Sequence, residues 1–230
     1  YSNNMDEQYS YIDAAKNRGY NILLMDGQLD VAMISMLEQK FEKSRFTRVD
    51  SDVIDRLIAK EEHKEANLES NQREILSSVF RSQLPQIKKV EFNVETQALG
   101  ENGAPIMITQ SEYMRRMKEM ANIQAGMSFY GEMPNMYNLV LNADHKLVKQ
   151  VLTDADNSCK AALEPIESEM ANLNNRRKEL QKAQEGKKTE DIPQAEKDEL
   201  NDIEKKISDE TTKKQAVLGE YANGNKIIHQ

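Results

Sequence analysis

Two carboxylates, Asp26 and Asp30, are the side chains of this sequence best placed for acid–base catalysis. Asp26 follows an apolar run at residues 20–25 that predicts a buried strand, and open α/β sheets bind ligands at the carboxyl ends of their strands. The same residues also have a structural interpretation, because Asp26-Gly27 is typical of a turn and Asp30 can cap a helix. That interpretation explains both residues fully, so we expect the chain to contain no catalytic residue.

The histidines and the cysteine do not form a reactive or metal-binding pattern. They are His63, His145, His229 and Cys159. None has the spacing typical of zinc ligands, and the sequence contains no glycine-rich phosphate loop or dinucleotide fingerprint. A Cys–His pair stays open as an alternative, although a lone buried cysteine usually only packs. We therefore expect neither a metal nor a cofactor to bind to this chain.

The composition argues against several classes of partner. The 230 residues contain 31 Lys and Arg against 39 Asp and Glu, a net charge of −8, whereas nucleic-acid binding needs clustered basic side chains. No apolar run of about 18 residues is present to span a membrane, and the start has no secretory signal pattern. A single cysteine cannot form an internal disulfide, which favours the cytoplasm. Because the chain starts without methionine and ends in what looks like a helix, we expect a fragment.

The best candidate for a binding surface is a methionine-rich segment. Thr109 and Glu112 have the spacing of a capping box and predict a helix from there to about Gln124. One face of this helix carries Tyr113, Met114, Met117, Met120 and Ala121. The basic residues Arg115, Arg116 and Lys118 lie mainly on the other faces. Methionine surfaces repack around unlike partners, so this face could bind exposed apolar segments of other proteins. Packing in a core is the alternative that the pattern alone favours, because amphipathic helices mostly bury their apolar stripe.

The elements around these residues predict a chain of mixed α/β and α+β class. Residues 1–84 predict a small α/β/α unit, in which strands at 20–25 and 45–49 flank a helix and form a short parallel pair. In that helix we expect Met33, Ile34, Met36 and Leu37 to face inward. Residues 85–230 predict an α+β domain with strands near 90–94, 106–108 and 137–141.

The segment at residues 153–222 predicts a long, charged, antiparallel helical hairpin. Its narrow apolar seam is formed by Leu163, Ile166, Met170, Leu173 and Leu180 in the first helix and by Leu200, Ile203 and Ile207 in the second. The hairpin could be a scaffold arm, a partner-binding site or a solvated insertion. The solvated insertion is the default, since charge runs on helices usually only solvate them.

Several long segments resemble, in unchanged order, the ninety-kilodalton heat-shock protein family of chaperones, and in particular its bacterial members. GYNILLMDGQLD (19–30) and LEQKFEKSRFTRVDSDVIDRLI (37–58) resemble the end of the family's middle domain. PIMITQSEYMRRMKEM (105–120) and FYGEMPNMYNLVLNADHKLV (129–148) resemble the start of its C-terminal domain. The resemblance implies a piece of a dimeric, ATP-driven clamp that binds partly folded client proteins. It also implies that ATP and Mg belong to a domain that this chain lacks, so that the parent protein is an ATPase and the chain is not.

The resemblance assigns roles to individual positions. It implies client binding by the helix face of Tyr113, Met114, Met117, Met120 and Ala121, with a second patch near Val31 and Ala32. The family dimerises through its last helices, which should begin near Ile227 and Ile228. We therefore expect a homodimer for the parent, and whether this chain dimerises stays open. The alternative function is a structural, dimer-positioning module in which the hairpin of residues 153–222 is the working part.

Overall fold

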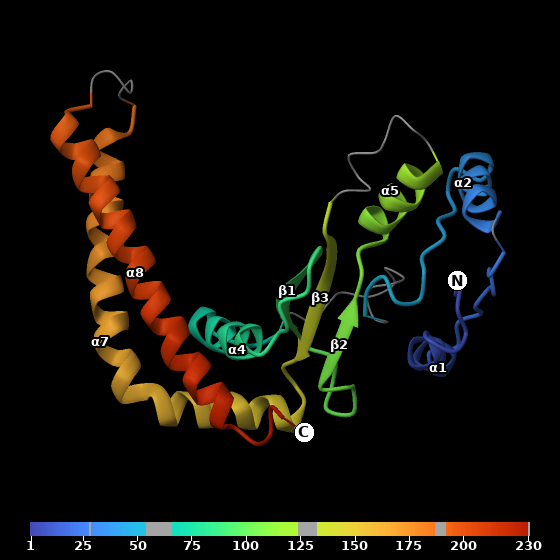
Figure 1. Cartoon of the computed structure of the whole chain (residues 1–230), viewed down its shortest axis with the longest axis horizontal. Helices are drawn as coiled ribbons and strands as arrows, with labels where there is room; N and C mark the ends of the chain where they lie inside the picture. The colour runs from blue at the N-terminus through green and yellow to red at the C-terminus, as the bar shows by residue number, and fades with distance from the viewer. Residues whose placement is uncertain (28, 54–65, 124–132, 187–191, 230) are drawn as a thin grey trace. The chain divides into compact units, whose positions relative to one another are not determined.

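The computed structural model describes residues 1–27, 29–53, 66–123, 133–186 and 192–229. The chain divides into two compact units (Figure 1). Unit 1 contains Tyr1–Leu68 and Pro85–Val148, and unit 2 contains Glu69–Leu84 and Lys149–Gln230. Each unit is therefore discontinuous in sequence, and the predicted boundary between domains at residues 84 and 85 remains a prediction. None of the described helices is long and apolar enough to cross a membrane.

Unit 1 is built on a three-stranded sheet of order β1-β3-β2. Its strands are β1 (Val90–Gln97), β2 (Ile106–Thr109) and β3 (Asn135–Asn142). β1 pairs with β3 in parallel and β2 pairs with β3 antiparallel. The sheet core contains Val94 on β1 and Leu139, Val140 and Leu141 on β3, all buried. The mixed α+β class is therefore confirmed, with β1 and β3 as the parallel pair.

The first residues of the chain lie between the two segments that were predicted to pair with each other. Neither residues 20–25 nor residues 45–49 form a regular strand. Instead, Ser2 bridges Leu24 in parallel, while the Val49 amide donates to the Tyr1 carbonyl at 2.9 Å. The direct pairing was wrong because the chain's own first residues take up the hydrogen-bonding edges.

The described residues of unit 1 include the helices α1 (Tyr9–Asn17), α2 (Asp30–Lys40) and α5 (Glu112–Ile123). α1 buries Ile12 and Ala15, and the chain leaves it through Gly19 at φ 75°. A glycine in this left-handed conformation is a common end of a helix. α2 buries Ile34 at 1% exposure, whereas Met33 and Met36 are exposed, so the inward orientation predicted for these two methionines was wrong.

Unit 2 consists of α4 (Ser70–Ser82), most of α7 (Lys146–Gln184) and α8 (Gln194–Gly224). α7 and α8 run antiparallel (Figure 1), which confirms the hairpin, although its first helix begins before residue 153. The distal seam is Leu173, Leu180 and Ile203, with Ile207 packed against them. Near the base, α4 packs on α8, where a Cβ added at Gly219 would lie 3.4 Å from Ser82 Cβ. Residues 226–229 form a turn instead of continuing a helix.

Candidate functional site

Helix α5 turns its charged side toward the rest of unit 1 and leaves its aromatic residue in solvent. Glu112, Arg115 and Arg116 are spaced i, i+3, i+4 and therefore lie on one side of the helix. Arg115 is only 5% exposed, whereas Tyr113 is 62% exposed. The common arrangement of an amphipathic helix, with the apolar stripe inside, is thus not found at Tyr113.

Glu112 is the centre of the polar contacts on this side. Its Oε1 accepts hydrogen bonds from Arg115 Nη2 at 2.7 Å and Arg116 Nε at 2.6 Å. Its Oε2 accepts one from Ser51 Oγ at 2.7 Å. Burial alone would raise the pKa of Glu112, but the Ser51 hydrogen bond and the charges of the two arginines outweigh it and hold the pKa below its ordinary value. Glu112 is therefore an ionised carboxylate that joins α5 to the segment around Ser51.

Arg116 extends these contacts to α2. Its Nη1 lies 2.7 Å from Glu38 Oε2, and its Nη2 donates to the Phe46 carbonyl. Glu38 Oε1 in turn accepts the Phe46 amide at 2.7 Å. Burial would raise the pKa of Glu38, yet the hydrogen bonds from Arg116 and from the Phe46 amide lower it on balance. We call Glu38, Glu112, Arg115 and Arg116 the Glu112 network.

Arg115 completes the network on the side of the first residue. Its Nη2 donates to the Tyr1 hydroxyl, and its guanidinium carbon lies 5.8 Å from the centre of the Tyr1 ring, within the range of a cation–π contact. Lys118, further along α5, donates from Nζ to Asn135 Oδ1 at 2.6 Å at the start of β3. The charged side of α5 is thus held by groups from the first residue, α2, residues 46–51 and β3.

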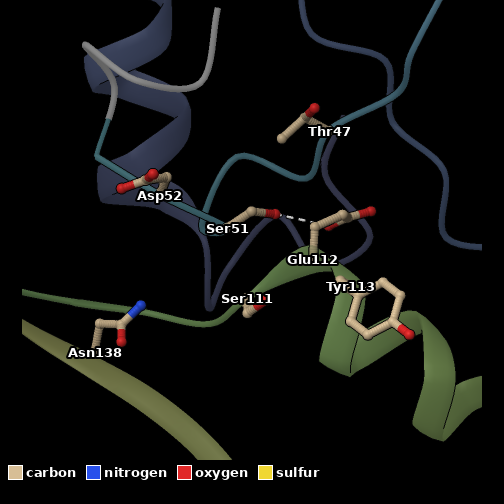
Figure 2. A pocket seen from close by; sticks show the side chains of 7 residues that line it. All are labelled: Thr47, Ser51, Asp52, Ser111, Glu112, Tyr113 and Asn138. Atoms are coloured by element: carbon tan, nitrogen blue, oxygen red, sulfur yellow. Dashed lines mark hydrogen bonds between the residues drawn. The ribbon is translucent and has the colours of Figure 1, made fainter. Parts of the chain in front are cut away.

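A shallow polar cavity of about 350 Å³ adjoins the first turn of α5 (Figure 2). Its lining residues are Thr47, Ser51, Asp52, Ser111, Glu112, Tyr113 and Asn138. Figure 2 shows the hydrogen bond between Ser51 and Glu112 at its edge. Hydroxyl, amide and carboxylate groups suit hydrogen bonding to a polar ligand, and the lining residues that the structure describes include no histidine or cysteine that could pair for nucleophilic chemistry.

The predicted client-binding face of α5 is partly open to solvent. Met114, Met117 and Ala121 are half-buried beside the exposed Tyr113. The side chain of Met120 lies outside the described residues, as does that of Val31 in the second predicted patch. Ala32 of that patch is exposed on α2. Client binding at these positions remains a proposal.

The other predicted residues are placed without a shared reactive site. Asp26 is exposed, and Asp30, the first residue of α2, accepts the Gly27 amide at 2.9 Å. The N-cap of α2 is Leu29, without a side-chain cap hydrogen bond, so the predicted capping role of Asp30 was wrong. Ile227 and Ile228 are half-buried in the turn after α8.

The potential metal ligands are likewise scattered. His145 Nδ1 accepts the Leu147 amide at 3.2 Å, and His229 Nε2 lies 3.1 Å from the Ala222 carbonyl. Cys159 is buried in α7, and burial raises the pKa of its thiol. His63 lies outside the described residues. Among the residues that are described, no three His, Cys, Asp or Glu side chains gather in a way that could hold a metal ion.

Sequence reasoning missed the Glu112 network. The i, i+3, i+4 spacing of one glutamate and two arginines was a signal for local ion pairs on α5. The capping-box interpretation concealed it, because Thr109 in fact ends β2 and is 1% exposed. Glu38 and Ser51 could not have been found from spacing, since they reach Glu112 and Arg116 only through the tertiary fold.

Comparison with known proteins places the chain in a family. The sequence model described as "Hsp90 protein" matches residues 2–166. Proteins named chaperone protein HtpG are similar over the whole chain: 66% identical in Bacteroides fragilis, 65% in Bacteroides thetaiotaomicron and 43% in Porphyromonas gingivalis. The chain spans 34% of the length of each of these relatives. No solved structure gives a significant match. With nearly three quarters of its residues matched by the family model and its whole length matched by these relatives, the chain belongs to the Hsp90 protein family.

Proposed function

We propose that this chain is the part of an Hsp90-family chaperone that binds partly folded client proteins through the outer side of α5. The observation that carries the proposal is the orientation of α5, with Arg115 at 5% exposure and Tyr113 at 62%. The half-buried Met114 and Met117 adjoin Tyr113 and supply an adaptable apolar surface. The relatives named chaperone protein HtpG support the same role.

The size of the effect follows from the apolar area. If a client covers roughly 100 Å² of apolar surface on Tyr113 and Met117, at about 25 cal/mol per Å² this contributes ~2.5 kcal/mol. Loss of that contribution weakens binding by roughly 70-fold. A variant that places carboxylates there should therefore bind an unfolded client at least about tenfold more weakly.

The test is a comparison of two double variants of the 230-residue chain. Tyr113→Asp with Met117→Asp changes the outer side of α5. Tyr9→Asp with Met5→Asp is the matched control, because both residues are exposed, at 69% and 57%, and neither lies on α5. Binding of a permanently unfolded, fluorescently labelled client is measured by anisotropy, with circular dichroism to verify folding. Equal affinities of the two folded variants would place the client site elsewhere.

We further propose that the complete protein is a cytoplasmic, ATP-hydrolysing homodimer, with ATP and Mg held by residues outside this chain. The relatives' length, of which the chain spans 34%, supports the existence of such residues. Ile227 and Ile228 would begin the dimer contact. Sedimentation of the chain with and without Ile227→Asp and Ile228→Asp tests that last point, since a self-association that survives both substitutions would place the contact elsewhere.

The second candidate function is a structural arm formed by α7 and α8. It is favoured by the continuous seam of Leu173, Leu180 and Ile203 and by the packing of α4 on α8. Replacing residues 171–208 by a short Gly-Ser turn removes the seam and retains Glu167 and Lys214 at the base. A loss of assembly in the complete protein, with client binding by the chain unchanged, would support the arm as the working part. Unchanged assembly would reduce it to a solvated insertion.

A further inference from the structure

The orientation of α5 requires a physical cause. An amphipathic helix ordinarily gains free energy by burying its apolar side, and Tyr113 with two half-buried methionines is such a side. Residues advance by about 100° along a helix, so a half-turn rotation of α5 would exchange the side of Arg115 and Arg116 for that of Tyr113 and Met117. The contacts that oppose this rotation must therefore act on the charged side.

The Glu112 network provides such contacts. Arg116 bonds at once to Glu112 on its own helix, to Glu38 on α2 and to the Phe46 carbonyl. Glu112 accepts a further bond from Ser51. The groups are largely shielded from water: the side chains of Glu112, Arg116 and Glu38 are 20%, 20% and 23% exposed. Rotating α5 would break several of these contacts, and no nearby group would replace them. The rotation would therefore cost free energy, because a shielded charge that loses its partner is destabilising.

We propose that Arg116, with Glu38 and Glu112, is a positioning residue that holds the apolar side of α5 outward for client binding. Arg116 is the member of the network whose planar guanidinium reaches two carboxylates and a carbonyl. This inference rests on the proposed function, because the position of α5 matters to clients only if its outer side binds them.

The first measurement reports the orientation of α5 without using a client. In a Cys159→Ala background, Tyr113→Cys introduces a thiol at an exposed position, and its rate of reaction with a maleimide measures its exposure. With Arg116→Gln, we expect this rate to fall by about threefold or more, as α5 turns its apolar side inward. Arg116→Lys retains the charge but not the forked guanidinium, so we expect its labelling rate to lie between those of the parent and of Arg116→Gln. Arg176→Gln is the matched control, an exposed arginine paired with Glu199 at 2.7 Å on the hairpin.

The second measurement is client binding in the same substitutions made without the introduced cysteine. We expect Arg116→Gln to weaken client binding by about tenfold and Arg176→Gln to stay within about threefold of the parent, with Arg116→Lys between the two. An unchanged labelling rate in folded Arg116→Gln would overturn the positioning role. So would a rise in that rate, which would mean that α5 unfolds and that Arg116 is only structural. A fallen labelling rate with undiminished client binding would uphold the positioning role and refute the client site on α5.

Discussion

Lys214 offers the sharpest test of how unit 2 is held together. It is a lysine on α8 whose side chain is only 4% exposed. Its Nζ donates to Asn71 Oδ1 at 2.9 Å and to Glu74 Oε2 at 3.0 Å on α4, and lies 3.0 Å from Glu167 Oε1 on α7. One ammonium group thus donates two hydrogen bonds to α4 and forms an ion pair with Glu167 on α7. Lys214→Met keeps most of the aliphatic stem and removes the charge, so the variant isolates these polar contacts.

The expected cost follows from the exposure of the partners. Hydrogen bonds to a charged group each contribute about 1.5–3 kcal/mol when shielded from water. The side chains of Glu74 and Glu167 are 45% and 37% exposed, so water can take over much of their solvation once the lysine is gone. We therefore expect Lys214→Met to lower the free energy of unfolding by about 2–3 kcal/mol, which corresponds to a fall in Tm of about 4–12 °C for a chain of this size.

The assay is urea unfolding followed by circular dichroism, with Lys213→Met as the control. Lys213 is the preceding residue on the same helix and pairs with Glu210 at 2.6 Å, but its side chain is 62% exposed. Its loss should change the free energy of unfolding by less than about 0.5 kcal/mol. If the two variants lose the same free energy of unfolding and have the same m-value, the buried contacts of Lys214 do not stabilise the packing of α4, α7 and α8.

Two further predictions concern the Glu112 network and the contact of α4 with α8. The pKa values of Glu38 and Glu112 are lowered in the folded chain, so their contribution to stability is fully present above their ordinary value of 4.5 and is lost as pH falls through the folded values. Glu112→Gln should therefore have a lower free energy of unfolding than the parent at pH 7, measured by urea unfolding. The difference between the two free energies should become smaller below pH 4.5, and a difference that does not depend on pH would contradict this. Gly219→Ala should raise the free energy of unfolding by about 0.5–1 kcal/mol, because alanine favours the helix and its Cβ would meet Ser82 at an ordinary 3.4 Å. Gly219→Leu should instead lower the free energy of unfolding by about 1–3 kcal/mol, because the larger side chain would push α4 away from α8. Equal stabilities of the alanine and leucine variants in thermal melts would show that the two helices do not approach closely there.

The sequence predicted the helices of this chain better than the sides that they bury. Periodicity located α5 and both long helices, since each has apolar residues at helical spacing. It also separated Tyr113 and Met117 from Arg115 and Arg116 on α5. Periodicity does not reveal which side of a helix has a neighbour, however. Here Glu38 and Tyr1 bond to the arginines, and Ser51 bonds to Glu112. The exposed Met33 and Met36 on α2 were misassigned for the same reason.

Strand pairing failed for a related reason. Residues 20–25 and 45–49 were predicted as strands from their composition, but composition does not determine which segment pairs with them. Tyr1 and Ser2 lie between them, donating to Thr47 at 2.7 Å and to Leu23 at 2.9 Å. Two residues are too few to show a periodic pattern, so the sequence could not predict that Tyr1 and Ser2 lie between these segments. The same limit applies to Thr109 and Glu112, whose spacing fits a capping box while Thr109 belongs to β2.

The match to the Hsp90 family model ends at residue 166, inside α7. The base of the hairpin nevertheless packs on residues that the model matches. α4 lies within the matched residues, and its partners on α8 lie beyond them. Lys214 bonds to Asn71 and Glu74, and Asn223 accepts from Gln83 at 3.0 Å. The relatives from Bacteroides and Porphyromonas are similar over all of these residues. If the hairpin were a freely added insertion, removing it at residue 166 would leave α4 intact. α8 supplies hydrogen-bond donors and acceptors to α4 and approaches it closely. We therefore expect removal of the chain after residue 166 to expose the apolar side of α4. Only a deletion confined to the distal seam tests the arm on its own.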